Sequence, residues 1–160
     1  LHDMGVDVDL IAGFRNTDAI ILEDEMKGAC SRLTLVTDDG SNGHKGFVTD
    51  ALKELIEAGN KYDVVIAIGP MIMMKFATLS AKKLGLPITV SLNTLMIDGT
   101  GMCGGCRVTV GGRTRFACVE GPEFNGYEVD FDEAMRRQGM YRPQEQASRE
   151  AFETHKCKLL

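Results

Sequence analysis

The chain has 160 residues, of which 44% are hydrophobic and 26% charged, and its formal net charge is −5. These values are ordinary for a globular protein, and the length suffices for one domain with a core and a small appendage. The negative charge, with no block of consecutive basic residues, argues against a nucleic-acid partner. No apolar run is long enough to cross a bilayer and no segment has the pattern of a signal peptide, so we expect a cytoplasmic protein without a membrane partner.

Strands and helices are expected to alternate at the start of the chain. Apolar runs predict strands at 6–12, 33–37, 64–68 and 88–91. The run 64–68 is almost wholly apolar, as expected of a central parallel strand covered on both faces. Three helices are predicted between these strands. The first is capped by Asn16 or Thr17 and has Leu22, Met26 and Ala29 on one face. The second stops at Gly59 and buries Val48, Leu52, Leu55 and Ile56, and the third runs from Gly69-Pro70 to about Leu84.

This alternation indicates βαβ units and an α/β fold whose parallel sheet binds ligands at the carboxyl ends of its strands. The glycine-rich phosphate loop that normally follows the first strand of such a sheet is missing. Residues 1–5 are typical of a helix end that runs into a strand. We therefore expect that the first strand lies upstream and that the natural protein begins before Leu1.

The pattern changes after Asn93, where glycine becomes frequent and helical periodicity disappears. Two short strands, 107–110 and 113–118, are predicted on either side of the turn Gly111-Gly112. Helices are predicted from Phe131 through Gln138 and, in a charged tail, within 144–158. The predicted domains are an incomplete nucleotide-binding domain at 1–92, a small Gly/Cys-rich β subdomain at 93–130 and a helical tail at 131–160.

Three of the five cysteines follow an aspartate in a spacing that indicates a metal centre. Asp98, Cys103, Cys106 and Cys118 reproduce the plant-type [2Fe-2S] pattern C-x4-C-x2-C plus a later cysteine, with aspartate at the first position. The intervening glycines let the backbone wrap closely around the sulfur atoms. Two ligands are needed per iron, and these residues supply four.

Other interpretations of the same residues stay open at this stage. Cys103 and Cys106 also have the spacing of a zinc knuckle, which Cys118 with Cys157 or His155 would complete in a non-redox interaction module. Asp98, followed by glycine, is also typical of a surface turn. A third hypothesis is an NAD(P)-dependent reductase with a purely structural metal. Cys30 is expected to be a core thiol and Cys157 a tail residue, not ligands.

Four motifs together resemble one family, the ferredoxin-reductase-like electron-transfer subunits. This family includes the dihydroorotate dehydrogenase electron-transfer subunit, sulfide dehydrogenase and the small subunit of NADH-dependent ferredoxin:NADP oxidoreductase. The resemblance covers nearly the whole chain, and its motifs are Thr37-Asp38-Asp39-Gly40-Ser41 with Lys45-Gly46-Phe47-Val48-Thr49-Asp50, Ile68-Gly69-Pro70 with Met73-Met74, Met96 to Cys106, and Phe116 to Phe124.

The resemblance implies a ferredoxin-reductase type of fold and a set of cofactors. In the family an FAD-binding β-barrel precedes the nucleotide domain, so FAD is implied for the full-length protein and this chain alone should hold it poorly. NAD(H) or NADP(H) would contact two groups of residues: Gly69, Pro70 and Met73 on the nicotinamide side, and Asp39, Gly40 and Ser41 on the pyrophosphate or ribose side. Arg15 would meet the adenosine, where it could accept a 2′-phosphate or stack on adenine.

Two departures from the family pattern refine the expectation. Dihydroorotate-type subunits carry four cysteines at the cluster, whereas Asp98 favours the ferredoxin:NADP oxidoreductase or sulfide dehydrogenase branch. Many ferredoxin reductases have Cys-Gly-Pro where this chain has Ile68-Gly69-Pro70, so no thiol is expected beside the nicotinamide.

The resemblance therefore predicts an electron-transfer subunit that relays electrons between NAD(P)H, FAD and a [2Fe-2S] cluster. The expected partner is a catalytic subunit with further flavin or iron–sulfur centres, and ferredoxin is a further candidate. No catalytic acid, base or nucleophile is assigned, because the cofactors perform the chemistry. The dihydroorotate dehydrogenase electron-transfer subunit is the alternative within the family.

Overall fold

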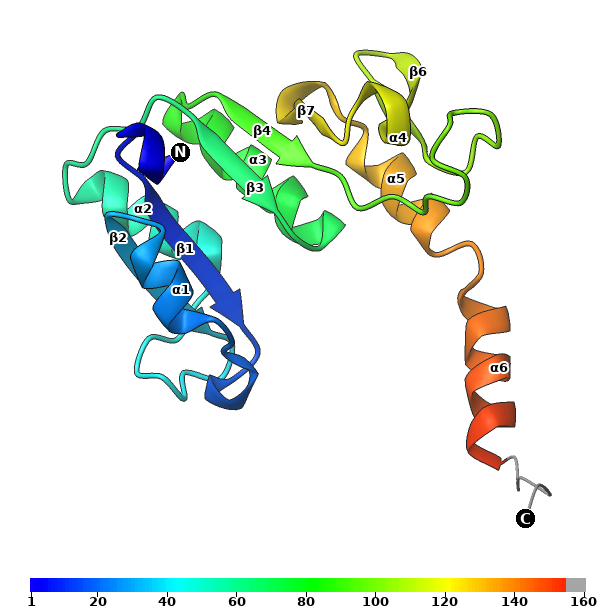
Figure 1. Ribbon diagram of the computed structural model, residues 1–160, viewed down its shortest axis with the longest axis horizontal. Coiled ribbons are helices and arrows are strands. Elements are labelled where there is room, and N and C mark those ends of the chain that lie inside the picture. The colour runs from blue at the N-terminus through cyan, green and yellow to red at the C-terminus, as the bar shows by residue number, and fades with distance from the viewer. Residues whose placement is uncertain (155–160) are drawn as a thin grey trace. The chain divides into compact units, whose positions relative to one another are not determined.

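The computed structural model describes residues 1–154, which fall into two compact units. Unit 1 is Leu1–Asp63, and unit 2 is the described part of Val64–Leu160 (Figure 1). His155 and Cys157, considered above as zinc ligands, lie outside the described residues, as does the end of the predicted tail helix. Among the described residues, no helix is both long and apolar enough to span a membrane.

Unit 1 is built on two parallel strands. β1 (Asp9–Phe14) pairs in register with β2 (Arg32–Thr37), so that Asp9 lies opposite Arg32 and Phe14 opposite Thr37. The helix α2 (Val48–Glu57) packs on this pair and buries Ala51 and Leu52. A Cβ at Gly13 would lie 2.8 Å from Cγ1 of Val48, so glycine is what allows the helix to approach β1 closely.

The predicted strands of unit 1 are present, but the predicted first helix is not continuous. β1 begins at Asp9 and not at residue 6. The stretch after Asn16 forms the short 3₁₀ helix η2 (Thr17–Ala19) and the helix α1 (Glu23–Gly28), separated by Leu22 at a left-handed φ of 56°. Asn16 does act as an N-cap, since its side chain accepts a hydrogen bond from Ala19 N at 3.0 Å. Another 3₁₀ turn, η1 (His2–Met4), precedes β1.

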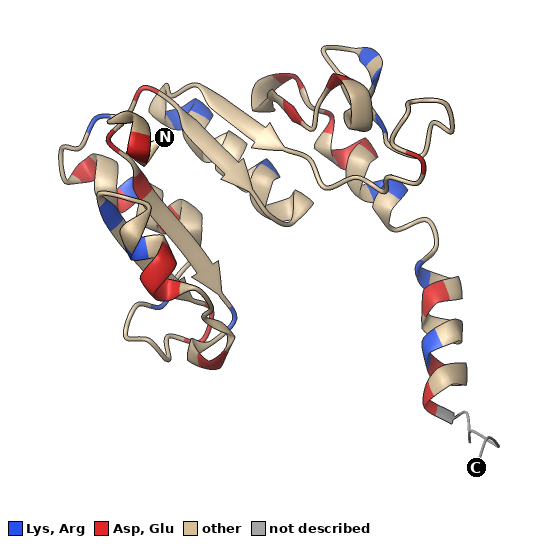
Figure 2. Cartoon of the chain, in the orientation of Figure 1, with Lys and Arg blue, Asp and Glu red and all other residues tan. Residues whose placement is uncertain are grey.

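Unit 2 is centred on a three-stranded sheet in the order β3 (Val65–Ile68), β4 (Ile88–Ser91), β7 (Glu123–Asn125). β3 and β4 are parallel, and β7 adds an antiparallel edge that the sequence pattern did not predict. The helix α3 (Met71–Leu84) packs against β3 and β4 and ends, as predicted, at Gly85 with φ 70°. Neither β3 nor β4 carries a charged residue (Figure 2).

Within unit 2, strand 64–68 is covered on one face, so the expected cover on both faces stays a prediction. Val64, Ile66 and Ile68 are 48%, 51% and 71% exposed, whereas Ala67 is buried. β3 is the edge strand of its sheet, and α3 covers only the face that carries Ala67. Alternate residues of a strand point to opposite faces, so the other three remain uncovered.

The glycine-rich region forms the predicted hairpin. β5 (Arg107–Val110) and β6 (Arg113–Phe116) pair antiparallel around Gly111 and Gly112, whose φ angles of 60° and 71° suit a type I′ turn. The second strand is shorter than predicted, because the chain turns after Phe116 into the one-turn helix α4 (Ala117–Glu120). Cys118 therefore lies on a helix and not at a strand end.

The remaining elements are helical. After η3 (Gly126–Glu128), α5 (Phe131–Gln138) has the predicted bounds and packs on α3 and β5, with Phe131 and Ala134 buried. α6 (Arg142–Thr154) confirms a helix in the charged tail and carries both acidic and basic residues along its length (Figure 2). The core of unit 2 thus lies between α3, the sheet, β5 and α5.

Candidate functional site

The loop that carries Asp98 folds around its own carboxylate. Oδ1 of Asp98 accepts a hydrogen bond from Thr100 N at 2.8 Å, and Oδ2 accepts one from Cys103 N at 2.9 Å. The backbone N–H of Thr100, followed by the contacts from Cys103, lowers the pKa of Asp98, so this carboxyl is ionised at neutral pH. The thiol of Cys103 is exposed and accepts from Gly105 N at 3.4 Å.

The hairpin brings Cys106 and Cys118 together. Cys106 precedes β5 and is 1% exposed, and Ala117 N extends the strand ladder by donating to Cys106 O at 3.2 Å. This pairing leaves the two Sγ atoms 3.3 Å apart, and Cys118 N points at Sγ of Cys106 from 3.5 Å. Burial opposes ionisation of Cys106, but N–H donors and the thiol of Cys118 outweigh it and lower the pKa of Cys106. The shared contact with Cys106 raises the pKa of Cys118.

The loop that carries Asp98 and the turn formed by α4, called the Cys118 turn below, also touch each other. A Cβ at Gly101, where φ is 83°, would lie 3.1 Å from Cγ2 of Val119. A Cβ at Gly104, where φ is 65°, would lie 3.1 Å from Nη1 of Arg107 and 3.7 Å from Cε1 of Phe116. Glycine is needed at both positions, because the backbone is left-handed and has a neighbour close to it.

The four predicted ligands lie in two pairs. The Asp98 carboxylate accepts from the backbone N–H of Cys103, and Sγ of Cys106 lies 3.3 Å from Sγ of Cys118. Among the described residues, no group of three or more His, Cys, Asp or Glu side chains is gathered tightly enough to hold a metal ion. One carboxylate and three thiols are four donors of the kinds that metal centres use.

Sequence reasoning missed a carboxylate that is bonded across the Cys118 turn. Oε2 of Glu120 accepts a hydrogen bond from Phe116 N at 2.7 Å, and Oε1 accepts one from Nη1 of Arg115 at 2.7 Å. The Arg115 guanidinium, with the Phe116 N–H, lowers the pKa of Glu120. An acidic residue after a cysteine is too common to stand out in a sequence, and its role here is visible only in the contacts.

The loop after β2 contains the residues predicted to contact a nucleotide. Oδ1 of Asp39 accepts from the N–H and the hydroxyl of Ser41, at 2.9 and 2.7 Å, and these bonds lower the pKa of Asp39. The Ser41 hydroxyl in turn accepts from Thr17 N at 2.8 Å. The carboxyl ends of β1 and β2 are thereby joined, and Gly40, with φ 79°, forms the turn between Asp39 and Ser41.

Asn42 organises this loop and was not among the predicted site residues. Its carboxamide oxygen accepts from Oγ1 of Thr37 at 2.9 Å and from His44 N at 3.0 Å. Its amide group donates to Leu35 O at 2.9 Å. Asn42 thus uses both ends of its amide to fix the loop, a role that a Ser-Asn-Gly turn sequence suggests only weakly.

The other predicted nucleotide residues are divided between the two units. Arg15 is exposed just after β1 in unit 1. Gly69 and Pro70 follow β3 in unit 2, and Met73 lies on the first turn of α3. A Cβ at Gly69, where φ is 154°, would come within 2.6 Å of Cε of Met73. Gly69 and Met73 are therefore in direct contact, at the carboxyl end of the parallel strands of unit 2.

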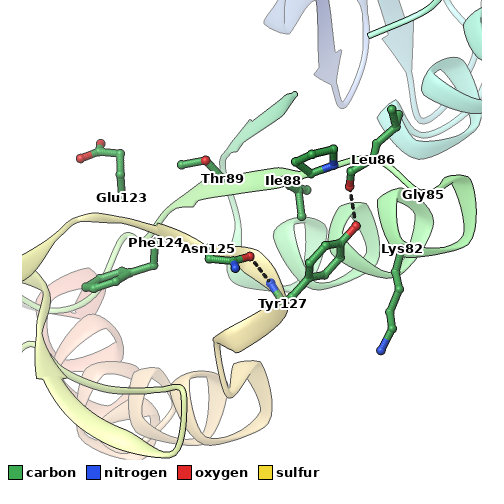
Figure 3. A pocket seen from close by; sticks show the side chains of 10 residues that line it. Lys82, Gly85, Leu86, Ile88, Thr89, Glu123, Phe124, Asn125 and Tyr127 are labelled. Carbon is green, nitrogen blue, oxygen red and sulfur yellow. Dashed lines mark hydrogen bonds between the residues drawn. The ribbon is translucent and has the colours of Figure 1, made fainter. Parts of the chain in front are cut away.

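A separate hollow of about 740 Å³ lies at the amino end of β4. Its lining includes Lys82, Thr89, Asn125 and Tyr127, and the Tyr127 hydroxyl donates to Leu86 O (Figure 3). The hollow contains none of the predicted site residues. It lies at the end of the sheet opposite to Gly69 and Pro70, because β3 and β4 run parallel.

Comparison with known proteins identifies the class to which this site belongs. Residues 93–130 match the iron–sulfur cluster binding domain of dihydroorotate dehydrogenase B. Together with the relatives described next, this match shows that the chain is similar to the dihydroorotate dehydrogenase B electron-transfer subunits, the family that its motifs resemble.

Particular relatives extend the match over most of the chain. An uncharacterized protein in the adh 3′ region of Clostridium beijerinckii is 56% identical over 91% of this chain and 49% of its own length. A dihydroorotate dehydrogenase B electron transfer subunit homolog of Thermotoga maritima is 53% identical over 95% of this chain and 53% of its own. The chain thus spans about half the length of the curated relatives it matches.

A solved structure supports the fold. It is that of an NADH-dependent reduced ferredoxin-NADP oxidoreductase, described in connection with flavin-based electron bifurcation. It superposes with a TM-score of 0.83 and 50% identity, covering 94% of this chain and 54% of that one. The α/β fold of ferredoxin-reductase-like type, predicted from the motifs, agrees with this neighbour.

Proposed function

We propose that this chain provides the nucleotide-binding and iron–sulfur part of an electron-transfer subunit in a flavin/iron–sulfur oxidoreductase. It would relay electrons between NAD(P)H, the FAD of the complete protein and a [2Fe-2S] cluster, to or from a partner subunit. The observation that carries the proposal is the paired arrangement of Asp98 with Cys103 and Cys106 with Cys118 inside the segment that matches an iron–sulfur domain.

Each pair would bind one iron. Cys106 and Cys118 are held by the ladder of the β5–β6 hairpin, and the N–H of Cys118 points at Sγ of Cys106. N–H donors lower the charge density on a ligating sulfur and so help to set the reduction potential. The bound cluster would accept and release single electrons, while this chain keeps its ligands in place and limits solvent access.

Asp98 can ligate iron without giving up its role in the loop. An ionised carboxylate has about four lone-pair sites. The backbone N–H groups of Thr100 and Cys103 occupy one site on each oxygen. A lone pair therefore remains free for a metal. The same two bonds would orient the carboxylate toward the side on which Cys103 lies.

The nucleotide would lie at the carboxyl ends of the parallel strands. On unit 2, Gly69, Pro70 and Met73 would line the nicotinamide side, and a side chain at Gly69 would collide with Met73. Asp39, Gly40 and Ser41 would face the ribose or pyrophosphate, and Arg15 the adenosine. Hydride exchange belongs to the nicotinamide and the flavin, so no residue of this chain needs to act as an acid or base.

The branch of the family is proposed from the first ligand. Asp98 stands where dihydroorotate-type subunits have a cysteine, which favours the ferredoxin:NADP oxidoreductase or sulfide dehydrogenase type. The partner would then be a catalytic subunit with further flavin or iron–sulfur centres, and ferredoxin a further electron carrier.

The test is the metal content and spectrum of anaerobically purified protein. We expect two irons and two acid-labile sulfides per chain, visible absorbance that dithionite bleaches, and an electron paramagnetic resonance signal in the reduced state. Cys106→Ser and Cys118→Ser should lose the absorbance. Cys30→Ser is the matched control, because this buried thiol donates to Met26 O in unit 1 and lies outside the proposed site.

Two results would contradict the proposal. One is a colourless protein that contains zinc and no sulfide. The other is full absorbance in both the Cys106→Ser and Cys118→Ser variants, since a cluster that needs neither thiol cannot be bound as described.

A further inference from the structure

The Cys118 turn is the part of the site that the hairpin ladder alone does not determine. The ladder ends with Ala117 N bonded to Cys106 O, and the chain then leaves the strand direction to form α4. α4 has only four residues, so its own hydrogen bonds cannot maintain it. Something else must hold the chain in the turn that directs Cys118 toward Cys106.

Glu120 makes the contacts that close this turn. Its carboxylate reaches back from the last residue of α4 to Phe116 N, the backbone group just before the helix, at 2.7 Å. The ring of Phe116 lies beside Gly104, within the loop that joins Cys103 to Cys106. Glu120 therefore bonds Phe116, which contacts the loop between Cys103 and Cys106 and leads directly into the Cys118 turn.

Arg115 adds a second bond and balances the charge. Its Nη1 donates to Oε1 of Glu120 at 2.7 Å. The two side chains are 43% and 33% exposed, so the ion pair by itself adds little to folding stability. Its larger effect would be electrostatic, because it neutralises a carboxylate two residues from a ligand of an anionic cluster.

We propose that Glu120, held by Arg115, is the positioning residue for Cys118: it closes the α4 turn by accepting the Phe116 N–H, and the pair keeps the charge beside the cluster balanced. This inference rests on the proposed function, because it takes Cys118 to be a cluster ligand. Glu120 itself does not bind iron.

The experiment compares Glu120→Ala, Glu120→Gln, Arg115→Gln and the Glu120→Gln/Arg115→Gln double variant with wild type, in the full chain purified anaerobically. Two quantities are measured: the rate at which an iron chelator removes the visible absorbance, and the midpoint reduction potential of the cluster. The matched control is Glu128→Gln, which removes the same charge beside Gly111 at the opposite end of the hairpin. Circular dichroism verifies that each variant is folded.

Glu120→Ala should lose its cluster about tenfold faster than wild type, because it removes the acceptor of the Phe116 N–H. Glu120→Gln keeps a side-chain oxygen that can accept this N–H, so it should lose its cluster more slowly than Glu120→Ala. The potential should rise in Glu120→Gln, because Arg115 is left uncompensated, and it should fall in Arg115→Gln, because Glu120 is left uncompensated. The double variant should return toward the wild-type potential.

An equal cluster lifetime in Glu120→Ala and wild type would overturn the positioning role, and equal potentials in Glu120→Gln, Glu128→Gln and wild type would overturn the charge balance. If Glu120→Ala failed to fold, Arg115→Gln would decide by its potential alone, since it leaves the Phe116–Glu120 bond intact, and an unchanged potential there would overturn the inference too. These failures are distinct from failure of the proposed function, in which wild-type protein itself would contain no iron.

Discussion

The loop after β2 and the loop after β4 are both rich in glycine, yet they are held in different ways. Residues 38–46 are fixed by side chains of the protein, with Asn42 bonded to Thr37, Leu35 and His44. Residues 98–106 are held mainly by one carboxylate, Asp98, and present exposed groups such as Cys103. The first loop is held by bonds among its own groups, whereas we expect a metal cluster to complete the second.

Removal of the iron offers the largest test of this difference. If the cluster completes the second loop, the amides of 98–106 in the iron-free protein should exchange at nearly the rate of unprotected amides. The amides of 38–46 should keep their protection, because their partners are all protein groups. Hydrogen exchange followed by mass spectrometry measures both loops in one sample. If iron removal speeded amide exchange equally in both loops, the two loops would not differ in the way described.

Substitution of Asn42 tests the first loop. Asn42→Ala removes three hydrogen bonds and leaves part-buried partners unsatisfied, so we expect a loss of about 2–3 kcal/mol in the free energy of unfolding. Urea titration gives the value, and iron content should stay at the wild-type level. Asn60→Ala is the control, since it removes one side-chain hydrogen bond, to Leu55 O, and should cost about 1 kcal/mol. A smaller loss for Asn42→Ala than for Asn60→Ala would show that the loop does not depend on Asn42.

A smaller effect is expected where the end of unit 1 is tied to its first strand. The Tyr62 hydroxyl donates to Oδ2 of Asp9 at 2.6 Å, and Asp9 also lies 3.3 Å from Nη1 of Arg32. Burial, followed by the bond to Asp9, raises the pKa of Tyr62 to about 12. Tyr62→Phe should therefore cost about 1 kcal/mol near neutral pH, measured by urea titration.

The pH dependence of this contact has a defined sign. The pKa of tyrosine is about 10 in an unfolded chain, and it is higher in the folded state, so folding favours the protonated hydroxyl. The contribution is fully present below about pH 10 and is lost as the pH rises through about 12. The difference in stability between wild type and Tyr62→Phe should shrink over that interval. A difference that stayed constant to pH 12 would contradict the assignment.

The elements that the sequence predicted well are those whose signals are local. Gly85 at the end of α3, Gly111-Gly112 in the hairpin and the periodicity of α5 involve residues within one or two turns of one another. The prediction of an iron–sulfur site rests on the same kind of signal, because the spacing of its cysteines is a property of one short segment. The match of residues 93–130 to an iron–sulfur domain agrees with it.

Other features depended on residues that are distant in the sequence or on contacts that no pattern records. β7 joins β4 through backbone bonds that any three-residue segment could form, so composition carried no sign of it. The exposure of Ile66 and Ile68 depends on which elements cover β3, and the sequence of a strand does not indicate which elements pack against it. Leu22 divides the predicted first helix because its φ is left-handed, a conformation that a leucine in a sequence does not predict.

By itself, therefore, the sequence determined the α/β alternation, the glycine turns and the identity of the four candidate ligands, because these follow from side-chain chemistry and short-range spacing. The tertiary structure decided which candidate ligands lie in pairs, that Cys118 sits on a helical turn, that Glu120 bonds Phe116 N across that turn, and that Asn42 holds the loop after β2. Directional hydrogen bonds form only once the backbone brings donor and acceptor to within about 3 Å, and that approach is a property of the folded chain.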